Sequence, residues 1–391
     1  MNDRTEIEGV ASRIFAAIEL SQSAWIVALH VPCQDKISLH RVASGDVDRL
    51  LVLFERARQT ARAASGAEAS APDPQICCCY EAGFDGFWLH RWLVARGISN
   101  QVLDSASIQV SRRKRHVKTD RIDAEGLVRV LMAWHRGESK ACSVVHVPTP
   151  EEEDAKRLHR ARENLLRERV RHVNRIKGLL TLHGVRHIEP MRQGWITALG
   201  ELETRDGRSF PPRLLAEIRR EAKLLELVKK LLVEVTTEIE ALVRSSTPAK
   251  GRRKAPPHPV ASRLIQLRGI GPIFASVLAT EVFYRRFTNR RAVASYVGLT
   301  PTPYSSGATH RDQGISKAGN SRGRHHAVEL AWLWLRNQPA SRLTAWFLER
   351  VSTGKSRVRR IAIVALARKL IVALWRYLET GLVPEGAVLK A

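Results

Sequence analysis

The sequence predicts an α/β domain followed by two largely helical segments. Short apolar runs alternate with helical patterns through residues 11–147. Apolar residues then recur at heptad spacing within residues 148–250, and helical patterns dominate residues 251–391. A linker at 244–262 is rich in Pro and positive charge, which predicts a boundary between the last two segments. We therefore expect three domains.

The first segment, residues 11–147, shows the alternation of an α/β domain. Its two opening apolar runs are split by Ser21-Gln22-Ser23, which predicts a β-hairpin. Residues with strand or helix patterns follow in turn. The expected strands are 14–20, 24–31, 76–80 and 98–103, and the expected helices are 47–61, 86–96 and one that begins at Asp120.

The middle segment, residues 148–250, begins with Thr149-Pro150-Glu151-Glu152, a capping box with Pro at the first helical position, and helix is expected to about Leu182. A second helix carries nine apolar residues spaced three or four apart, flanked by Glu and Lys. This pattern predicts a coiled-coil hairpin or dimer seam, and the alternative is a helix packed on its own domain. The nine positions are Leu214, Ile218, Ala222, Leu225, Val228, Leu232, Val235, Ile239 and Leu242.

The whole chain of 391 residues is strongly basic, with 64 Lys and Arg against 39 Asp and Glu and a formal net charge of +25. Such an excess indicates a polyanionic partner, most simply a nucleic acid. The polar first ten residues do not resemble a secretory signal, and the longest apolar run, 361–378, contains three cations and is too charged for a membrane span. The five cysteines form no zinc or disulfide pattern. We expect a cytoplasmic, nucleoid-associated protein without a membrane partner.

Four carboxylates stand where a metal site can form. Glu19 and Glu81 each end an apolar strand, and Asp120 and Asp123 are three residues apart at the start of a helix, so they share one face. Clustered carboxylates of this kind can hold two Mg²⁺ ions that clamp a phosphodiester. The alternative is that Asp120 is only an N-cap and that the helix dipole favours Asp123.

Several basic and glycine-rich positions are candidates for nucleic-acid binding. A basic run precedes Asp120, and Gly269-Ile270-Gly271 forms a turn between two expected helices, as in helix-hairpin-helix elements. The alternatives are a solvated face and an ordinary helix C-cap. The candidate residues are Arg112, Arg113, Lys114, Arg115, Lys118, Gly269, Gly271, Lys317, Asn320 and Arg324.

Residues 298–320 are expected to form a loop rich in Gly, Ser and Thr. A serine surrounded by cations can attack phosphorus, because the cations stabilise the developing charge. No His-Asp pair announces a catalytic triad, and the alternative is an ordinary Ser-Gly loop. The stretch Tyr304-Ser305-Ser306-Gly307 presents such hydroxyls.

Together these motifs resemble the insertion-sequence transposases of the Asp-Glu-Asp-Asp type, the bridge-RNA-guided serine recombinases. The resemblance covers nearly the whole chain and is specific through the order and separation of its motifs. Two positions depart from the pattern: Glu19 stands where the family name has Asp, and Arg268 stands where proline commonly precedes the Gly-Ile-Gly turn. The motifs are Ala17-Ile18-Glu19-Leu20-Ser21, Tyr80-Glu81-Ala82-Gly83, Lys118-Thr119-Asp120-Arg121-Ile122-Asp123-Ala124, Gly269-Ile270-Gly271-Pro272, Gly298-Leu299-Thr300-Pro301, Ser306-Gly307 and Ile315-Ser316-Lys317-Ala318-Gly319-Asn320.

The resemblance implies a RuvC-like, RNase H-type acidic domain at 11–147, a helical coiled-coil segment at 148–250 and a mostly α transposase domain at 251–391 that carries the serine loop. Glu81, Asp120 and Asp123 match the second, third and fourth acidic positions, with Glu19 in the first. Ser306 in the Ser-Gly step matches the nucleophile, and Ser305 is its nearest rival. The nucleophile would form a phosphoserine link to DNA while carboxylate-bound Mg²⁺ assists.

The implied partners are donor and target DNA, a structured non-coding guide RNA, and further copies of the chain in a dimer or tetramer whose sites combine the acids of one protomer with the serine of another. Two alternatives remain at this point. One is a metal-dependent RuvC-like junction nuclease without a covalent intermediate, in which water attacks. The other is a nucleic-acid-binding protein without enzymatic activity.

Overall fold

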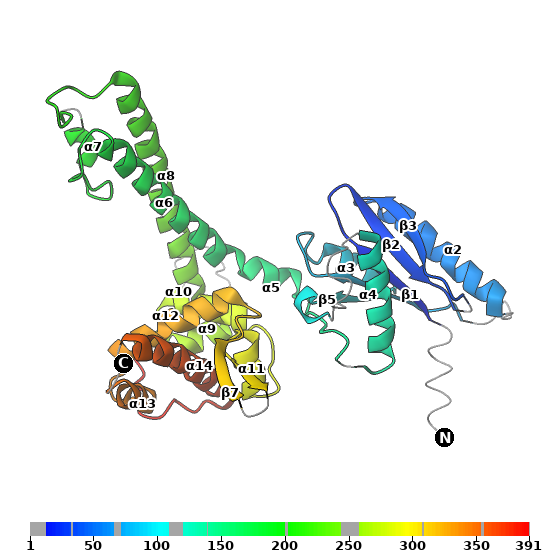
Figure 1. The fold of residues 1–391 in the computed structure, drawn as a ribbon. Coiled ribbons are helices and arrows are strands. Elements are labelled where there is room, and N and C mark those ends of the chain that lie inside the picture. The colour runs from blue at the N-terminus through cyan, green and yellow to red at the C-terminus, as the bar shows by residue number, and fades with distance from the viewer. Residues whose placement is uncertain are drawn as a thin grey trace, which may run out of the picture. The chain divides into compact units, whose positions relative to one another are not determined.

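The chain forms two compact units in the computed structural model, Met1–Thr149 and Pro150–Ala391 (Figure 1). We describe each unit by itself. The structure describes residues 13–32, 34–65, 72–108, 120–138, 140–199, 202–243, 258–306, 309–352 and 356–390.

The first unit is built on a five-stranded mixed sheet with the order β3-β2-β1-β4-β5. The strand β1 pairs antiparallel with β2 and parallel with β4, and β5 is also parallel to β4. The strands β1, β2 and β4 are continuous apolar runs, as expected for strands buried on both faces. The strands are β1 (Ile14–Glu19), β2 (Ala24–His30), β3 (Ser38–Ala43), β4 (Ile76–Glu81) and β5 (Ser99–Leu103).

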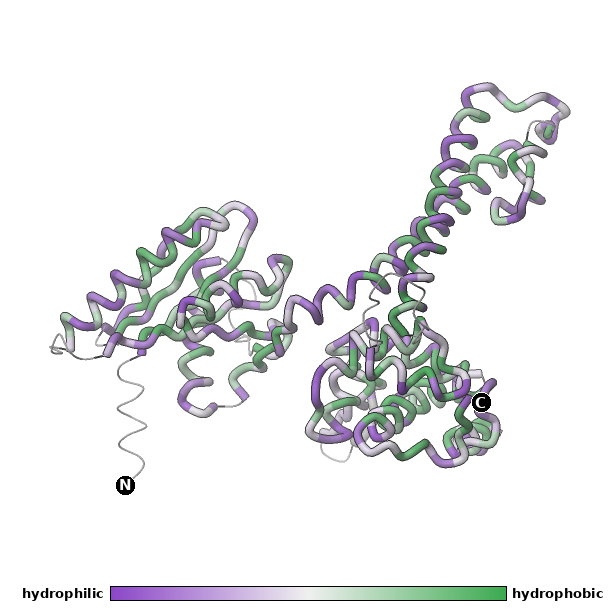
Figure 2. Tube along the Cα trace, turned by 180° about the vertical axis from the view of Figure 1, so that it is seen from behind, coloured by the Kyte–Doolittle hydropathy of each residue, from purple (hydrophilic) through white to green (hydrophobic). Residues whose placement is uncertain are grey.

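Helices cover both faces of this sheet and give it two hydrophobic cores. On one face lie α2 (Val47–Ser65) and α3 (Trp88–Val94), which contribute Phe54 and Leu93 to the larger core. On the other face lies α4 (Asp120–His135), whose Leu127 packs with Phe15 of β1. In Figure 2, α2 alternates between hydrophilic and hydrophobic residues along its length, as a helix with one buried face does. A short 3₁₀ turn, η1 (Ser105–Ser107), follows β5.

The second unit begins with a helical hairpin. The helix α5 (Pro150–Ala155) starts with Pro and three glutamates, which suit the N-terminal end of a helix dipole. The helices α6 (Arg157–Thr181) and α8 (Pro212–Val243) then pack against each other, with α7 (Trp195–Ala198) between them in the chain (Figure 1). The expected heptad stripe on α8 is largely buried: Ile218, Ala222, Leu225, Val228, Leu232 and Ile239.

The rest of the second unit is a helical core with one β-hairpin. The central helix α14 packs against α11, α12 and α13, and its inner face carries Leu366, Leu370 and Leu374, all buried. The elements are α9 (Pro259–Leu264), α10 (Pro272–Val277), a π-helical turn η3 (Leu278–Val282), α11 (Arg290–Tyr296), β6 (Pro301–Ser306), β7 (Thr309–Ile315), α12 (Ser321–Asn337), α13 (Arg342–Val351) and α14 (Ser356–Thr380).

The expected α/β organisation of the first segment and the helical character of the rest are confirmed. Three details of the expectation were wrong. The polar edge strand β3 was not foreseen, the helix expected over 150–182 is interrupted between α5 and α6, and the expected loop at 298–320 contains the antiparallel pair β6 and β7. In the described part of the chain, none of the helices combines the length and the apolar character that crossing a bilayer requires.

Candidate active site

Two of the predicted acids lie at one edge of the sheet in the first unit. Glu19 is the last residue of β1 and Glu81 the last residue of β4. These strands are parallel neighbours, and their register pairs Ile18 with Tyr80, one residue before each acid. Glu19 and Glu81 therefore lie side by side at the carboxyl ends of adjacent strands, and both are half-buried.

The helix α4 brings the other two acids toward the same edge. Its last residue, His135, stacks edge-on against Phe15 at the start of β1, with the ring centroids 5.4 Å apart. The helix has 16 residues and is about 24 Å long, which exceeds the length of β1, so its first turn lies toward the carboxyl end of that strand. Asp120 and Asp123 stand in this first turn. The first turn of α4 thus points toward the end of the sheet that carries Glu19 and Glu81, and we call Glu19, Glu81, Asp120 and Asp123 the acidic edge.

The acidic edge has the donor chemistry of a magnesium site but not its close packing. Carboxylate oxygens are the ligands that Mg²⁺ takes in proteins. Asp120 is exposed and Asp123 is half-buried. Within the described ranges, no three His, Cys, Asp or Glu side chains are grouped closely enough to hold a metal ion. Among the described residues, the acidic edge therefore has the ligand chemistry of a metal site without its close grouping.

The predicted nucleophile lies at the tip of a hairpin in the second unit. Ser306 is the last residue of β6 and pairs in register with Thr309, the first residue of β7. Its side chain is exposed. Ser305 is also exposed and points to the opposite face of the strand. The hairpin therefore offers the Ser306 hydroxyl to a ligand.

Glycines lock the base of this hairpin. Gly298 has φ +65°, and a Cβ there would lie 2.0 Å from the carbonyl oxygen of Ala318. Gly319 has φ +78°, and a Cβ there would lie 2.3 Å from the carbonyl oxygen of Tyr296. The backbone N–H of Lys317 donates to the Gly298 carbonyl at 3.2 Å. The segments before and after the hairpin are thus packed backbone against backbone, which holds its two strands at their base.

A buried carboxylate, Glu281, anchors the chain segment that follows the β6–β7 hairpin. Glu281, 3% exposed in the turn η3, accepts from Nε of Arg160 at 2.8 Å and lies 2.9 Å from Nε2 of His159. Burial by itself raises the pKa of Glu281, but the hydrogen bonds to His159 and Arg160 outweigh it and hold the pKa well below its usual range. Asn320 joins this cluster, since its Nδ2 donates to the Glu281 carboxylate and backbone carbonyl while its Oδ1 accepts from Gly323 and caps α12.

The cluster of Glu281, His159, Arg160 and Asn320 was not found by the sequence reasoning. A usable signal existed, because Glu281 is the lone charge in the apolar run 273–283. A carboxylate on a buried helix needs cationic partners, and α6 supplies them.

The predicted nucleic-acid-binding residues have different environments. Arg112, Arg113, Lys114, Arg115 and Lys118 lie outside the described residues.

Of the remaining candidates, Arg324 donates to the carbonyl oxygens of Val297 and Ala318, so like Asn320 it is bonded to the protein itself. Gly269 has φ +90° and closely approaches the side chain of Asn337, and Gly271 is the N-cap of α10. Lys317 is exposed and borders the hairpin. Lys317 is therefore the candidate in this group whose side chain is most available.

Comparison with known proteins places these features in one class. Residues 261–345 match the sequence model of the Transposase IS116/IS110/IS902 family. The chain is 47% identical over 379 residues, covering 96% of this chain and 94% of the relative, to the protein named "Putative transposase y4rJ" of Sinorhizobium fredii. It is 29% identical to the transposase for insertion sequence element IS1328 of Yersinia enterocolitica, covering 68% of this chain and 73% of that protein.

A further relative is the transposase for insertion sequence element IS1111A of Coxiella burnetii, which is 26% identical and aligns over 77% of each chain. The protein is thus an insertion-sequence transposase, an enzyme class that transfers DNA strands. The chain belongs to the IS110/IS116 transposase family.

Proposed function

We propose that the protein exchanges DNA strands through a covalent phosphoserine link at Ser306. The hydroxyl oxygen of Ser306 attacks the scissile phosphorus and loses its proton, and the bond from phosphorus to the leaving deoxyribose oxygen breaks as that oxygen takes a proton. The reverse attack by a deoxyribose hydroxyl of the second DNA releases Ser306. Phosphodiester energy is conserved throughout, so no nucleotide cofactor is required. The exposed position of Ser306 at the end of β6 carries this proposal.

We further propose that the first unit is a RuvC-like, RNase H-type domain that assists this chemistry. The sheet order β3-β2-β1-β4-β5, with one antiparallel β-meander and two parallel strands, supports this assignment. Glu19, Glu81, Asp120 and Asp123 are the proposed Mg²⁺ ligands, and their common edge supports the proposal. Bound Mg²⁺ would supply positive charge opposite a phosphodiester.

Oligomerisation and RNA guidance complete the proposal. Outside its buried stripe, α8 exposes Leu224, Leu227 and Leu231, which are spaced as one helix face and would suit a second copy of the chain. A dimer or tetramer would let acids and serine from different protomers meet at one phosphate. The net charge of +25 supports the simultaneous binding of DNA and a structured guide RNA.

Two single variants test the nucleophile. Purified protein is incubated with end-labelled DNA carrying the element's junction, a transcript of its flanking non-coding DNA, and Mg²⁺, and covalent adducts are resolved after denaturation. The wild type and Ser305→Ala are expected to form a labelled adduct whose phosphorylated residue maps to Ser306 by mass spectrometry. Ser306→Ala is expected to form none.

A metal-dependent junction nuclease is the second candidate function. The placement of Glu19 and Glu81 at the ends of neighbouring strands favours it, because a water held at the acidic edge would then be the nucleophile. If Ser306→Ala still cuts the DNA and no variant yields an adduct, the nuclease replaces the recombinase.

A further inference from the structure

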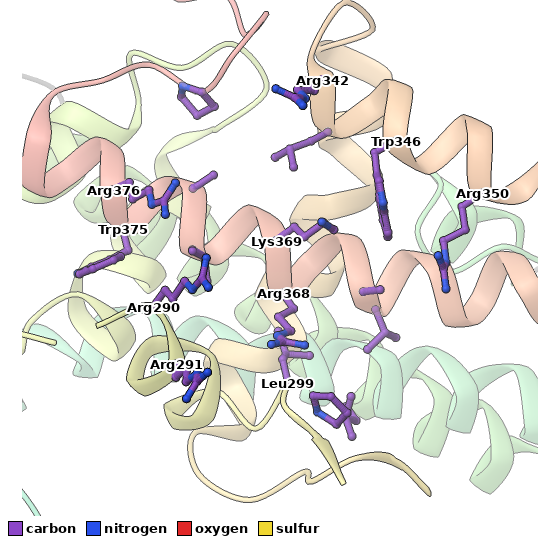
Figure 3. Close-up of a pocket in the computed structure, with 18 of the residues that line it drawn as sticks. Arg290, Arg291, Leu299, Arg342, Trp346, Arg350, Arg368, Lys369, Trp375 and Arg376 are labelled. Carbon is purple, nitrogen blue, oxygen red and sulfur yellow. The ribbon is translucent and has the colours of Figure 1, made fainter. Parts of the chain in front are cut away.

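A large basic groove lies in the second unit. It borders the base of the β6–β7 hairpin that carries Ser306, which we call the serine hairpin, and not its tip. Its volume is about 1960 Å³, and it is bounded by α11, α13, α14 and the end of β7 near Ile315. Figure 3 shows Arg290 and Arg291 on α11, Trp346 on α13, and Arg368 and Arg376 on α14 around this space. We call it the α14 groove.

The α14 groove carries a strong excess of positive charge. Ten of its lining residues are Arg or Lys, and two are Glu. Arg342 is paired with Glu385, with 2.7 Å between Nη1 and Oε2. Among the described residues no other lining cation forms an ion pair. Nine cations that share one concave surface without carboxylate partners repel one another, so an anionic ligand would stabilise the groove.

One face of α14 supplies both charge and apolar surface. Arg360, Val364, Arg368, Val372 and Arg376 follow at intervals of four residues and all line the groove. The opposite face is buried in the helical core. The floor of the groove therefore alternates guanidinium groups with half-buried aliphatic side chains.

The wall on α13 adds an aromatic ring. Trp346 is half-buried and has two cations near its ring, with Nζ of Lys369 4.7 Å and Cζ of Arg350 5.7 Å from the ring centroid. Figure 3 shows the indole of Trp346 standing between Lys369 and Arg350. An aromatic ring with flanking cations suits an unpaired base whose phosphates lie to either side.

We propose that the α14 groove binds a single-stranded segment of the DNA substrate and leads it toward the β6–β7 hairpin. A duplex presents phosphates outward and hides its base faces, so it would use the cations but not the aliphatic floor or Trp346. An unpaired strand uses all three. The choice of DNA rests on the proposed strand exchange, in which a cut strand must leave its duplex. Pro301 and Gly314 at the base of the hairpin, and Lys317 just after it, line the same groove, so the groove reaches the hairpin.

The experiment measures binding by full-length protein without Mg²⁺, using fluorescence anisotropy with a 20-nucleotide thymidine oligomer, a 20-base-pair duplex and a 20-nucleotide uridine oligomer over a range of KCl. The variant Arg360→Gln/Arg368→Gln/Arg376→Gln is expected to bind the thymidine oligomer at least about tenfold more weakly. The salt slope, which is the change in log affinity with log salt concentration, should fall by about 2, at about 0.7 for each phosphate that is no longer neutralised.

The matched control, Arg213→Gln/Arg219→Gln/Arg220→Gln, removes the same charge from exposed positions on α8. It is expected to retain affinity within about twofold, because salt screens charges that lie far from the bound strand.

Trp346→Ala gives an independent reading. It is expected to weaken binding of the thymidine oligomer about fivefold or more with an unchanged salt slope, because stacking releases no counterions, and to leave duplex binding unchanged. A thermal unfolding curve confirms that each variant is folded. Ser306→Ala is expected to bind as the wild type does, so a failure of the phosphoserine proposal leaves this binding result intact.

Three results would overturn the proposal. The α14 variant could bind the thymidine oligomer as the α8 control does. It could lose duplex binding as strongly as single-strand binding, which would assign the groove to duplex DNA. The wild type could prefer the uridine oligomer by tenfold or more, with that preference lost in the α14 variant, which would assign the groove to RNA.

Discussion

The acidic edge and the serine hairpin hold their candidate residues in opposite ways. Glu19 and Glu81 extend directly from strands whose preceding residues are fully buried, so the sheet itself fixes where they lie. Ser306 lies on a strand in which every residue is exposed, so its position depends on contacts at the base of the hairpin. Substitutions at the edge should therefore change chemistry alone, whereas substitutions at the hairpin base should change both stability and chemistry.

The largest effect is expected at the acidic edge. Glu81→Gln and Asp123→Asn each keep the size of the side chain and remove its charge, and each is expected to lower DNA cleavage about a hundredfold or more. Thermal unfolding should be nearly unchanged. Asp48→Asn, an exposed site on α2 across the sheet, is the control and should retain activity. An equal loss in all three variants would mean that charge at this edge has no special role.

The buried carboxylate under the hairpin should have the next largest effect. Glu281→Gln leaves His159 and Arg160 without their anion, and since Arg160 is partly exposed we expect a loss of about 2–3 kcal/mol in the free energy of unfolding of the second unit. Chemical denaturation followed by circular dichroism measures it. Asp206→Asn, at an exposed ion pair, is the contrast and should be close to neutral.

The same carboxylate predicts a pH dependence. Because the pKa of Glu281 is lower in the folded state than in the unfolded chain, its stabilising effect is complete above the unfolded value of about 4.3 and is lost as the pH falls below that value toward the folded pKa. Unfolding curves are recorded from about pH 6 to about pH 3, which spans the unfolded pKa of a glutamate. As the pH falls, the free energy of unfolding of the wild type should decrease faster than that of Glu281→Gln. Parallel curves would contradict this assignment.

A glycine substitution distinguishes close packing from backbone conformation. Gly298→Ala adds a Cβ against the Ala318 carbonyl at a positive φ, and we expect a loss of about 2 kcal/mol together with reduced strand exchange. Gly314→Ala has φ +97° but open space around its Cβ, so it should lose only about 1 kcal/mol. Similar losses in the two variants would show that the backbone conformation matters and the contact with Ala318 does not.

The smallest effect concerns the surface of α4. Arg129 pairs with Glu125 one turn earlier, and Arg129→Gln should reduce the stability of the first unit by about 0.3–0.5 kcal/mol without changing cleavage. This variant sets the baseline against which the losses at the acidic edge are judged. A large drop in cleavage would indicate that Arg129 itself contacts the DNA.

The sequence was informative where burial is continuous along the chain. The runs that became β1, β2 and β4 are apolar on both faces, and the acids at their ends were found because a charge directly after such a run stands out. The strand β3 was missed since only one of its six residues, Val42, is both apolar and buried. The β6–β7 hairpin has exposed residues throughout β6 and thus no alternation to detect.

The Glu281 cluster joins residues about 120 positions apart in the chain, and no local pattern encodes such a pairing. The α14 groove had a similar problem. Its cations come from several elements, and each looks like an ordinary solvated residue until the helices are packed together.

The length of α8 imposes a rule on how this protein can vary. Its 32 residues span about 48 Å, and its buried stripe meets α6 along one side. An insertion of seven residues in each arm would lengthen the hairpin by about 10 Å and keep the stripe in register, whereas an insertion of five would rotate the outer part by more than a quarter turn. Homologues of different size should accordingly differ here by whole heptads. The α6–α8 helical hairpin is then a spacer whose length changes only in steps of about 10 Å.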